Sequence, residues 1–304
     1  IIMGHIIADL KETFKRGNIY IQLIYINVAV FVAGTLTEIV LQLFNIRINT
    51  FSNWFALPAS FADFLCQPWS IFTYMFIHAG ALHLLFNMLW LYWFGRLFLY
   101  FFSAKHLRGL YVLGGICGGL LYMIAYNVFP FFSDQIAGSI LVGASASVLA
   151  IVAATAYREP NYPVQLFLFG SIRLKYLALI VIGMDVLSIT SNNAGGHIAH
   201  VGGALAGLWF ASSLSKGTDL TDWINKALDS CLSLLQGRKG TRKPKMKVHY
   251  GNQSTSKRAQ DYDYNAQKKA QSEEVDRILE KLKKSGYDSL TSEEKKSLFD
   301  TSKR

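Results

Sequence analysis

Six long apolar stretches constrain the fold of this sequence more than any other feature. A hydrocarbon core about 30 Å thick is crossed by a helix of about 20 apolar residues, and backbone in lipid must satisfy its own hydrogen bonds. We therefore expect an all-α, polytopic membrane protein with six transmembrane helices. Of the 304 residues, 52% are hydrophobic and only 16% are charged, a low charged fraction for a soluble domain. The predicted spans are residues 21–43, 81–103, 107–128, 139–157, 173–191 and 197–214.

Lys and Arg near the span ends predict the orientation, because these residues collect on the cytoplasmic side. The loops 44–80, 129–138 and 192–196 together contain one basic residue, Arg47. The other connecting segments are richer in basic residues: Lys11, Lys15, Arg16, Lys105, Arg108, Arg158, Arg173 and Lys175. We expect residues 1–20 to be a cytoplasmic segment, the C-terminus to be cytoplasmic, and the protein to lie in the cell (inner) membrane. No signal-peptide cleavage pattern precedes the first span, which is expected to remain as an anchor.

Polar residues from three predicted spans fall at one depth, in the outer half of the membrane. His83 and Asn87 lie near the start of the second span, Ser145 near the start of the fourth, and His197 and His200 near the start of the sixth. Polar side chains in a bilayer are costly unless they meet partners or water. Their common depth therefore predicts a functional site.

These residue types suit acyl transfer. Serine is a weak nucleophile until a base removes its proton, and imidazole has the appropriate pKa near neutrality, so Ser145 and His200 form a candidate pair. His83 and Asn87 are four residues apart and share one helix face. Both can donate hydrogen bonds to the oxyanion of a tetrahedral intermediate, and the backbone amide of Ser145 is a further candidate donor.

Small residues flank the candidate nucleophile and base. Gly143 precedes Ser145, and Gly203 and Gly207 follow His200 at a four-residue spacing. Small residues allow two membrane helices to approach closely. We expect these glycines to pack the fourth and sixth spans together.

Three motifs in this chain resemble those of the rhomboid family. His83-Leu-Leu-Phe-Asn87 resembles its H-x-x-x-N motif, Gly143-Ala-Ser145-Ala resembles its G-x-S-x motif, and Ala199-His200-Val-Gly-Gly203-Ala-Leu-Ala-Gly207 resembles its A-H-x-x-G-x-x-x-G motif. The motifs occur in family order, and the resemblance covers residues 20–214. Phe76-Ile-His78 also resembles the F-x-H stretch of the family.

The resemblance implies a six-span rhomboid-like bundle over residues 21–214 that acts as an intramembrane serine endopeptidase. Ser145 would be the nucleophile and His200 the base of a dyad without an acid, with His83 and Asn87 as oxyanion donors. Transmembrane protein substrates would be cut near the outer leaflet through an acyl-enzyme. No cofactor and no metal are expected.

The sequence departs from the family pattern at three positions. Trp69 is followed by Ser70, where many rhomboids have Arg. Leu149 stands four residues after the nucleophile, where some members have an aromatic residue that stacks on the base. Ala146 follows the nucleophile, where Gly is common.

Several alternatives remain open from the sequence. The chain could be a catalytically silent rhomboid-like protein that binds membrane clients. The histidines could form a metal site instead, because imidazole is a common metal ligand; they are His78, His83, His197 and His200. His197 could be mistaken for the base, although it lacks the following Gly-x-x-x-Gly in register. Asp185 could orient His200 as a triad acid or be a partner in a polar cavity.

The remainder of the chain is predicted to form a partly disordered helical tail. Residues 215–236 show apolar spacings of three and four and are predicted to form an amphipathic helix. Residues 237–272 have the composition of a flexible, basic linker, and residues 273–304 are predicted to form a small helical hairpin. The run Arg238 to Lys247 contains six Lys or Arg, for which we expect contact with the anionic lipids of the bilayer rather than nucleic acid.

Overall fold

The computed structural model describes residues 14, 17–46, 51–166, 170–235, 273–284, 286 and 289–295. The chain divides into two compact units, Ile1–Gly237 and Arg238–Arg304. The linker predicted over residues 237–272 and its basic run lie outside the described residues. So do most of the predicted segment 1–20 and all of residues 296–304.

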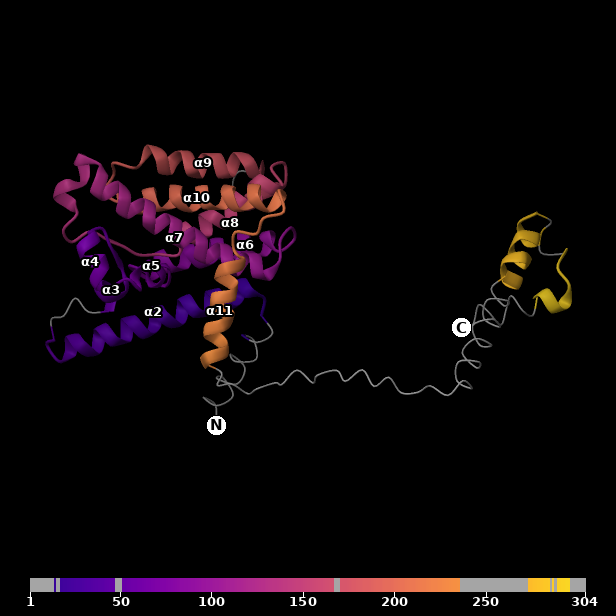
Figure 1. Ribbon diagram of the computed structural model, residues 1–304, viewed down its shortest axis with the longest axis horizontal. Coiled ribbons are helices and arrows are strands. Elements are labelled where there is room, and N and C mark those ends of the chain that lie inside the picture. Colours follow the sequence, from indigo (N-terminus) through magenta and orange to yellow (C-terminus); the bar gives the residue numbers. More distant parts are fainter. Residues whose placement is uncertain are drawn as a thin grey trace, which may run out of the picture. The chain divides into compact units, whose positions relative to one another are not determined.

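Helices account for most of the first unit, and Figure 1 shows the longer ones packed as a bundle. Each of the six predicted apolar stretches contains one long helix, and one more helix follows them. These are α2 (Ile19–Leu43), α6 (Ala81–Phe98), α7 (Ala104–Val128), α8 (Ser145–Arg158), α9 (Leu174–Leu187), α10 (Ala194–Ser215) and α11 (Asp222–Leu235). Short helices occupy the connections: α3 (Phe51–Phe55), α4 (Phe61–Cys66), α5 (Ser70–Thr73), η1 (Tyr74–Phe76) and η2 (Pro130–Gln135).

The expectation of an all-α fold is confirmed in that the described residues are mostly helical, and the connections also contain two short antiparallel strand pairs. Strand β1 (Leu57–Pro58) pairs with β2 (Ile140–Leu141), and β3 (Pro163–Leu166) pairs with β4 (Gly170–Arg173). The apolar run from residue 139 was expected to be helical throughout. However, Gly138 and Gly143 have φ angles of +87° and +122°, which a helix cannot accommodate, so α8 begins only at Ser145.

Three helices of the described part of the chain are long and apolar enough to cross a membrane, by length and composition: α2, α7 and α10. Residues Ser70–Phe76 and helix α6 pass the same test together, but they meet at an angle of 92°. Counting that bent pair as one span gives up to four. Helices α8 and α9 contain 14 residues each, fewer than a perpendicular crossing requires.

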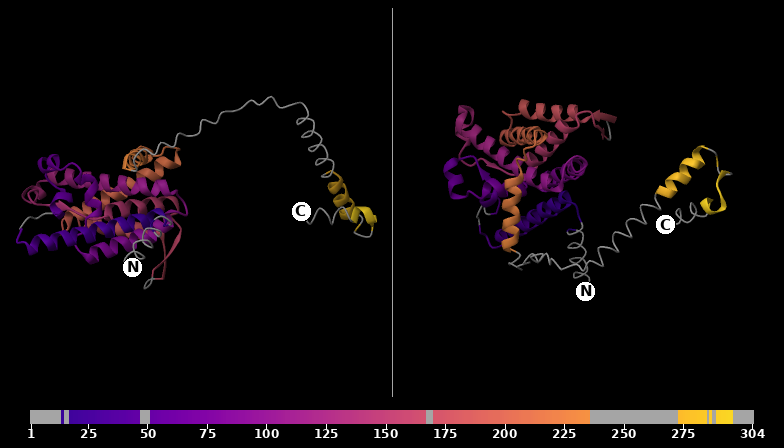
Figure 2. Two further views of the ribbon diagram at one scale, coloured as in Figure 1. Left: turned by 90° about the horizontal axis from the view of Figure 1, so that it is seen from below. Right: turned by 45° about the vertical axis from the view of Figure 1, so that its right-hand side comes forward.

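Helices α7, α8 and α10 form the centre of the bundle, between α9 at one edge and α2 at the other (Figures 1 and 2). Their contacts are made by small residues. A Cβ atom on Gly114 would lie 2.4 Å from the Cβ of Ala150, and one on Gly118 would lie 2.6 Å from the Cβ of Ala146. The three helices therefore approach more closely than larger side chains would allow.

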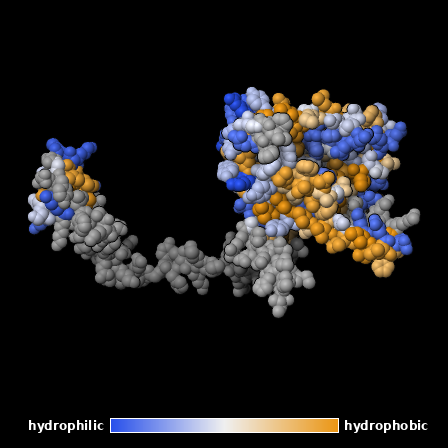
Figure 3. All heavy atoms as spheres, turned by 180° about the vertical axis from the view of Figure 1, so that it is seen from behind, coloured by the Kyte–Doolittle hydropathy of each residue, from blue (hydrophilic) through white to orange (hydrophobic). Residues whose placement is uncertain are grey.

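The outer helices expose large hydrophobic side chains, and Figure 3 shows hydrophobic residues gathered over a broad area of the helical unit. Leu36 on α2 is 57% exposed and Leu187 on α9 is 86% exposed. Soluble monomers rarely expose contiguous apolar surface on this scale. This surface is suited to contact with lipid.

Helix α11 packs against the beginning of α7. The Asn225 side chain donates to the Lys105 carbonyl oxygen at 3.1 Å and accepts from Arg108 Nε at 2.9 Å. Arg108 also forms an ion pair with Asp229 at 2.8 Å. Polar contacts thus fix this helix at the end of the bundle that carries Lys105 and Arg108.

The second unit contains two described helical segments, residues 273–284 and 292–295. Gly286 follows the first with a φ of +75°, as is common at helix C-termini. The Glu294 carboxylate accepts from the Thr291 backbone amide at 2.8 Å, the Thr291 hydroxyl accepts from the Glu294 amide, and Lys281 contacts Glu294 at 2.9 Å. A reciprocal capping box therefore begins the second segment.

Candidate active site

A cavity of about 720 Å³ lies between α6, α8, α9 and α10. The four polar residues singled out from the sequence all contribute to its lining: His83, Asn87, Ser145 and His200. They come from three helices that lie far apart in the chain. The structure therefore brings the predicted nucleophile, base and oxyanion donors to one place.

Close contact between α8 and α10 places Ser145 and His200 at the same end of two neighbouring helices. A Cβ atom on Gly203 would lie 2.1 Å from the carbonyl oxygen of Ala146, and one on Gly207 would lie 2.1 Å from that of Ala150. The two contacts follow in the same order along both helices, which therefore run parallel. Ser145 and His200 each lie within one turn before the first contact.

The loop before Ser145 needs glycine at position 143. The φ of Gly143 is +122°, and a Cβ atom there would lie 2.9 Å from Cε1 and Nε2 of His83. The backbone amide of Gly143 donates to the carbonyl oxygen of Tyr74 at 3.0 Å. The loop is thereby held against α6, next to the ring of His83.

Hydrogen-bond donors surround this point. Nδ1 of His83 accepts from the Ala79 backbone amide at 3.4 Å, which places the ring proton on Nε2, on the side of the ring that faces Gly143. Asn87 donates one side-chain hydrogen to the His83 carbonyl oxygen at 2.9 Å and keeps a second. Ser145 begins α8 without a side-chain cap, and the first amides of a helix lack intrahelical acceptors. The arrangement can therefore stabilise an oxyanion.

Asp185 of α9 forms the closest polar contacts of the candidate base. Its Oδ1 lies 2.9 Å from Nδ1 of His200 and 2.8 Å from Nδ1 of His197. Within the described residues, no hydrogen bond joins Ser145 to His200, and such bonds often form only when substrate binds. Asp185, His197 and His200 also form a possible ligand set for a metal ion, since their ligand atoms lie within 4.8 Å of one another.

Comparison with known proteins identifies the family. The Rhomboid domain family matches residues 65–217, about half of the chain. This chain belongs to the rhomboid family. The expectation from the three motifs is thereby confirmed. Together with the apolar helices, the match identifies a multi-pass membrane protein.

One relative is RHOMBOID-like protein 12, mitochondrial, from Arabidopsis thaliana. It is 28% identical to this rhomboid over 157 residues, which are 49% of this chain and 47% of the relative. The chain thus spans about half the length of this relative. Residues 260–304 match a second family, a family of unknown function (DUF6576).

The departures of this rhomboid from the motif pattern have visible structural counterparts. Trp69 donates from its indole to the Trp54 carbonyl oxygen at 2.9 Å, and the two rings stack at 6.1 Å, so aromatic contacts link this part of the loop. Leu149, in place of an aromatic residue, lines the cavity. In contrast, His78, which matches the F-x-H stretch, packs its ring against that of His83 at 5.2 Å.

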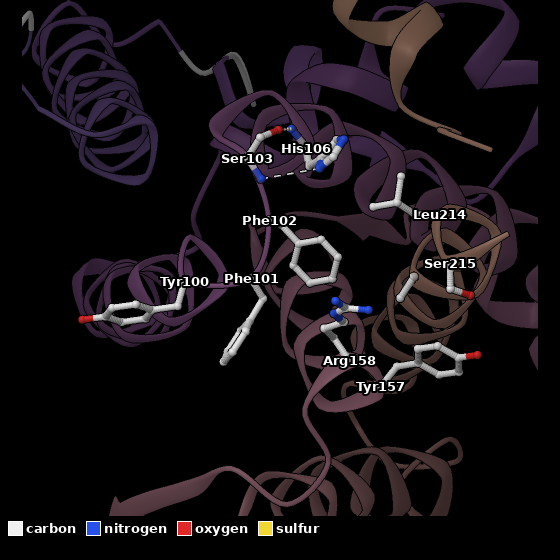
Figure 4. A pocket seen from close by; sticks show the side chains of 10 residues that line it. Tyr100, Phe101, Phe102, Ser103, His106, Tyr157, Arg158, Leu214 and Ser215 are labelled. Carbon is white, nitrogen blue, oxygen red and sulfur yellow. Dashed lines mark hydrogen bonds between the residues drawn. The ribbon is translucent and has the colours of Figure 1, made fainter. Parts of the chain in front are cut away.

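A second cavity of about 520 Å³ lies at the other end of α8 (Figure 4). Arg158, the last residue of α8, and the helix-capping pair Ser103 and His106 line it. Ser145 is the first residue of the same 14-residue helix, so the two cavities lie about 20 Å apart along the bundle. None of the predicted site residues lines this second cavity.

Proposed function

We propose that this rhomboid is an intramembrane serine endopeptidase that cuts transmembrane protein substrates near the outer leaflet. The observation that carries the proposal is one cavity lined by a serine, a histidine from a neighbouring parallel helix, and two oxyanion donors. Family membership supports it. The alternative, a catalytically silent protein that binds membrane clients, would not require this set.

In the proposed reaction, Ser145 Oγ attacks the substrate carbonyl carbon while its proton passes to Nε2 of His200. His83, Asn87 and the Ser145 amide stabilise the oxyanion. The C–N bond then breaks, and His200 returns the proton to the leaving amine. Water hydrolyses the acyl-enzyme with His200 again acting as base, which restores the Ser145 hydroxyl.

We place the six helices α2, α6, α7, α8, α9 and α10 across the cell (inner) membrane, with both termini cytoplasmic. A 14-residue α8 with Arg158 at the inner face would rise only about 20 Å. Ser145 would then lie about 10 Å below the outer boundary of the hydrocarbon core. The short helix therefore accounts for a recessed site that water must enter from outside.

Substrates are proposed to be membrane proteins whose helix unwinds at the cleavage site, because a helix hides its scissile carbonyl in its own hydrogen bonds. Helix α9 forms one wall of the cavity through Val181, Met184, Asp185 and Ser188. We propose α9 and the segment before His197 as the gate through which the substrate enters.

We also propose that the basic run 238–247 contacts anionic lipids.

Fluorophosphonate labelling tests the proposal. The purified wild-type protein should be labelled at Ser145, Ser145→Ala should not be labelled, and His200→Ala should be labelled far more slowly. Ser230→Ala is the control, because this serine is exposed on α11 and lies outside the cavity; its labelling should equal that of the wild type. A chelator should leave the rate unchanged.

Equal labelling of the wild type and Ser145→Ala would contradict the proposal, and an unlabelled wild type that retains membrane clients would favour the silent alternative. If labelling is confirmed, a proteomic comparison of membranes from wild-type and Ser145→Ala cells would identify the substrates.

A further inference from the structure

Asp185 occupies an unusual position for an acidic residue. It lies in the apolar helix α9 and is only 6% exposed. Its Oδ1 is shared by the Nδ1 atoms of His200 and His197, at 2.9 and 2.8 Å. Its Oδ2 is buried and has no hydrogen-bond partner within the described residues. A buried carboxylate is costly unless it is paired. The contacts with the two imidazoles offset this desolvation cost.

The chemistry of the contact determines where the proton of His200 lies. An ionised carboxylate only accepts hydrogen bonds, and a neutral imidazole carries one N–H. Nδ1 of His200 must therefore be the protonated nitrogen. Its Nε2 is left with a free lone pair, which is the form of the ring that can take a proton from a serine hydroxyl.

We infer that Asp185 is a positioning residue for the base of this rhomboid, an inference that rests on the proposed function. It holds His200 in the Nδ1–H tautomer with Nε2 free and stabilises the imidazolium formed when Ser145 Oγ transfers its proton to Nε2. Asp185 itself stays ionised throughout. The dyad expected from the family resemblance thus has an acidic partner in this chain.

His197 has a distinct part in this arrangement. Its Nδ1 lies 2.8 Å from the same Asp185 oxygen that contacts His200, and the two rings lie 6.0 Å apart, edge to face. In this arrangement His197 holds Asp185, and His200, within one turn of the contact of Gly203 with α8, is the base. Replacement of His197 should weaken the orientation of His200 less than loss of the carboxylate does.

Replacement of Asp185 by Asn tests the inference. Asp185→Asn keeps the shape of the side chain and removes its charge, so fluorophosphonate labelling of Ser145 should slow by about 10- to 100-fold. In cleavage of a transmembrane substrate, kcat should fall while KM changes little. Ser230→Ala, an exposed serine on α11 outside the cavity, is the control and should label at the wild-type rate.

Nitrogen NMR of labelled histidine supplies a measurement that does not depend on the variant folding. In the wild type, His200 should carry its proton on Nδ1, and in folded Asp185→Asn this preference should be lost. A wild-type His200 protonated on Nε2, or a folded Asp185→Asn that labels at the wild-type rate, would overturn the inference and leave the proposed function intact. A wild-type protein that is not labelled would instead contradict the proposed function. The His200 tautomer measured by NMR would still test whether Asp185 positions that ring.

Discussion

Gly203 shows how a missing side chain decides the geometry of the site. With no Cβ atom, it allows the backbone of α10 to lie against the carbonyl oxygen of Ala146, directly after Ser145. Any larger residue must push α8 and α10 apart. The separation between the Ser145 hydroxyl and the His200 imidazole would then increase.

Gly203→Ala should therefore reduce both stability and activity. The added methyl group would lie 2.1 Å from the Ala146 oxygen, and overpacking of this kind typically costs about 1–3 kcal/mol. Labelling of Ser145 should slow by about 10- to 100-fold, because small misplacements of reacting groups are costly. Thermal unfolding and labelling kinetics check this. Gly183→Ala is the control, since nothing lies within 4 Å of its added atom; equal losses in both variants would contradict the explanation.

Asn87→Ala should lower kcat on the order of 100-fold with little change in KM, because an oxyanion donor acts mainly in the transition state. Steady-state cleavage of a transmembrane substrate in vesicles would measure both constants. Asn161→Ala is the control, because Asn161 is exposed in the turn after α8 and lies outside the cavity. An unchanged kcat in Asn87→Ala would exclude the donor role.

The sequence pattern placed Ser145, His200, His83 and Asn87 at one predicted depth, and all four line the same cavity. The pattern did not decide between the two roles considered for Asp185. The contact of that residue depends on the rotation of α9 about its axis and on the rotamers of two histidines. Neither quantity is readable from one sequence. The signal available was only an acid within an apolar run.

At the scale of elements, the long apolar stretches predicted where the six long helices lie but not where they begin and end. Helix α8 was expected to begin near residue 139 and begins at Ser145. Its preceding residues pair as strand β2 with β1, more than 80 positions earlier in the chain. A pairing at that separation is set by tertiary structure, which local propensity does not report.

The attachment of α11 to α7 is expected to depend on Asn225. Asn225→Ala removes the contacts with the Lys105 carbonyl and with Arg108 and should cost about 1–2 kcal/mol, since two partly buried hydrogen bonds are lost. Hydrogen exchange of the α11 amides should become faster. Asp222→Asn, which removes an exposed ion pair with Lys226 in the same helix, should change little. Equal exchange in both variants would argue against Asn225 as the attachment.

The second unit should lose its capping box in acid. The Thr291 backbone amide, with the Lys281 ammonium, lowers the pKa of the Glu294 carboxyl from its ordinary value of 4.5. Because the pKa of Glu294 is lower in the folded state, its ionised carboxylate stabilises the folded second unit fully above pH 4.5. This stabilisation is lost as the pH falls through the lower pKa of the folded state. NMR signals of residues 291–295 in the full chain should show this transition. Glu294→Gln should lack it; an identical acid transition in that variant would assign the effect elsewhere.

At the scale of the whole molecule, the catalytic proposal and the tail belong to different parts of the chain. Every residue that lines the candidate site lies in the first unit, and the two family matches cover separate ranges, 65–217 and 260–304. The C-terminal match therefore lies within the second unit.

Removal of residues 237–304 should leave fluorophosphonate labelling of Ser145 unchanged, because the truncation retains α11 and the entire cavity. The measurement compares labelling rates of the full and shortened chains in the same vesicles. The shortened chain carrying Ser145→Ala serves as the blank. A large fall in rate on truncation would mean that the second unit supports the site directly.

The acid that holds the candidate base belongs to neither of the helices that carry the base and the nucleophile. Asp185 is supplied by α9, the helix proposed to move when a substrate enters. Any outward swing of α9 would withdraw the carboxylate from the imidazole and leave the serine without an aligned partner. Such an enzyme would be inactive while α9 is displaced, and it would cut only a substrate that allows α9 to return to its place beside His200.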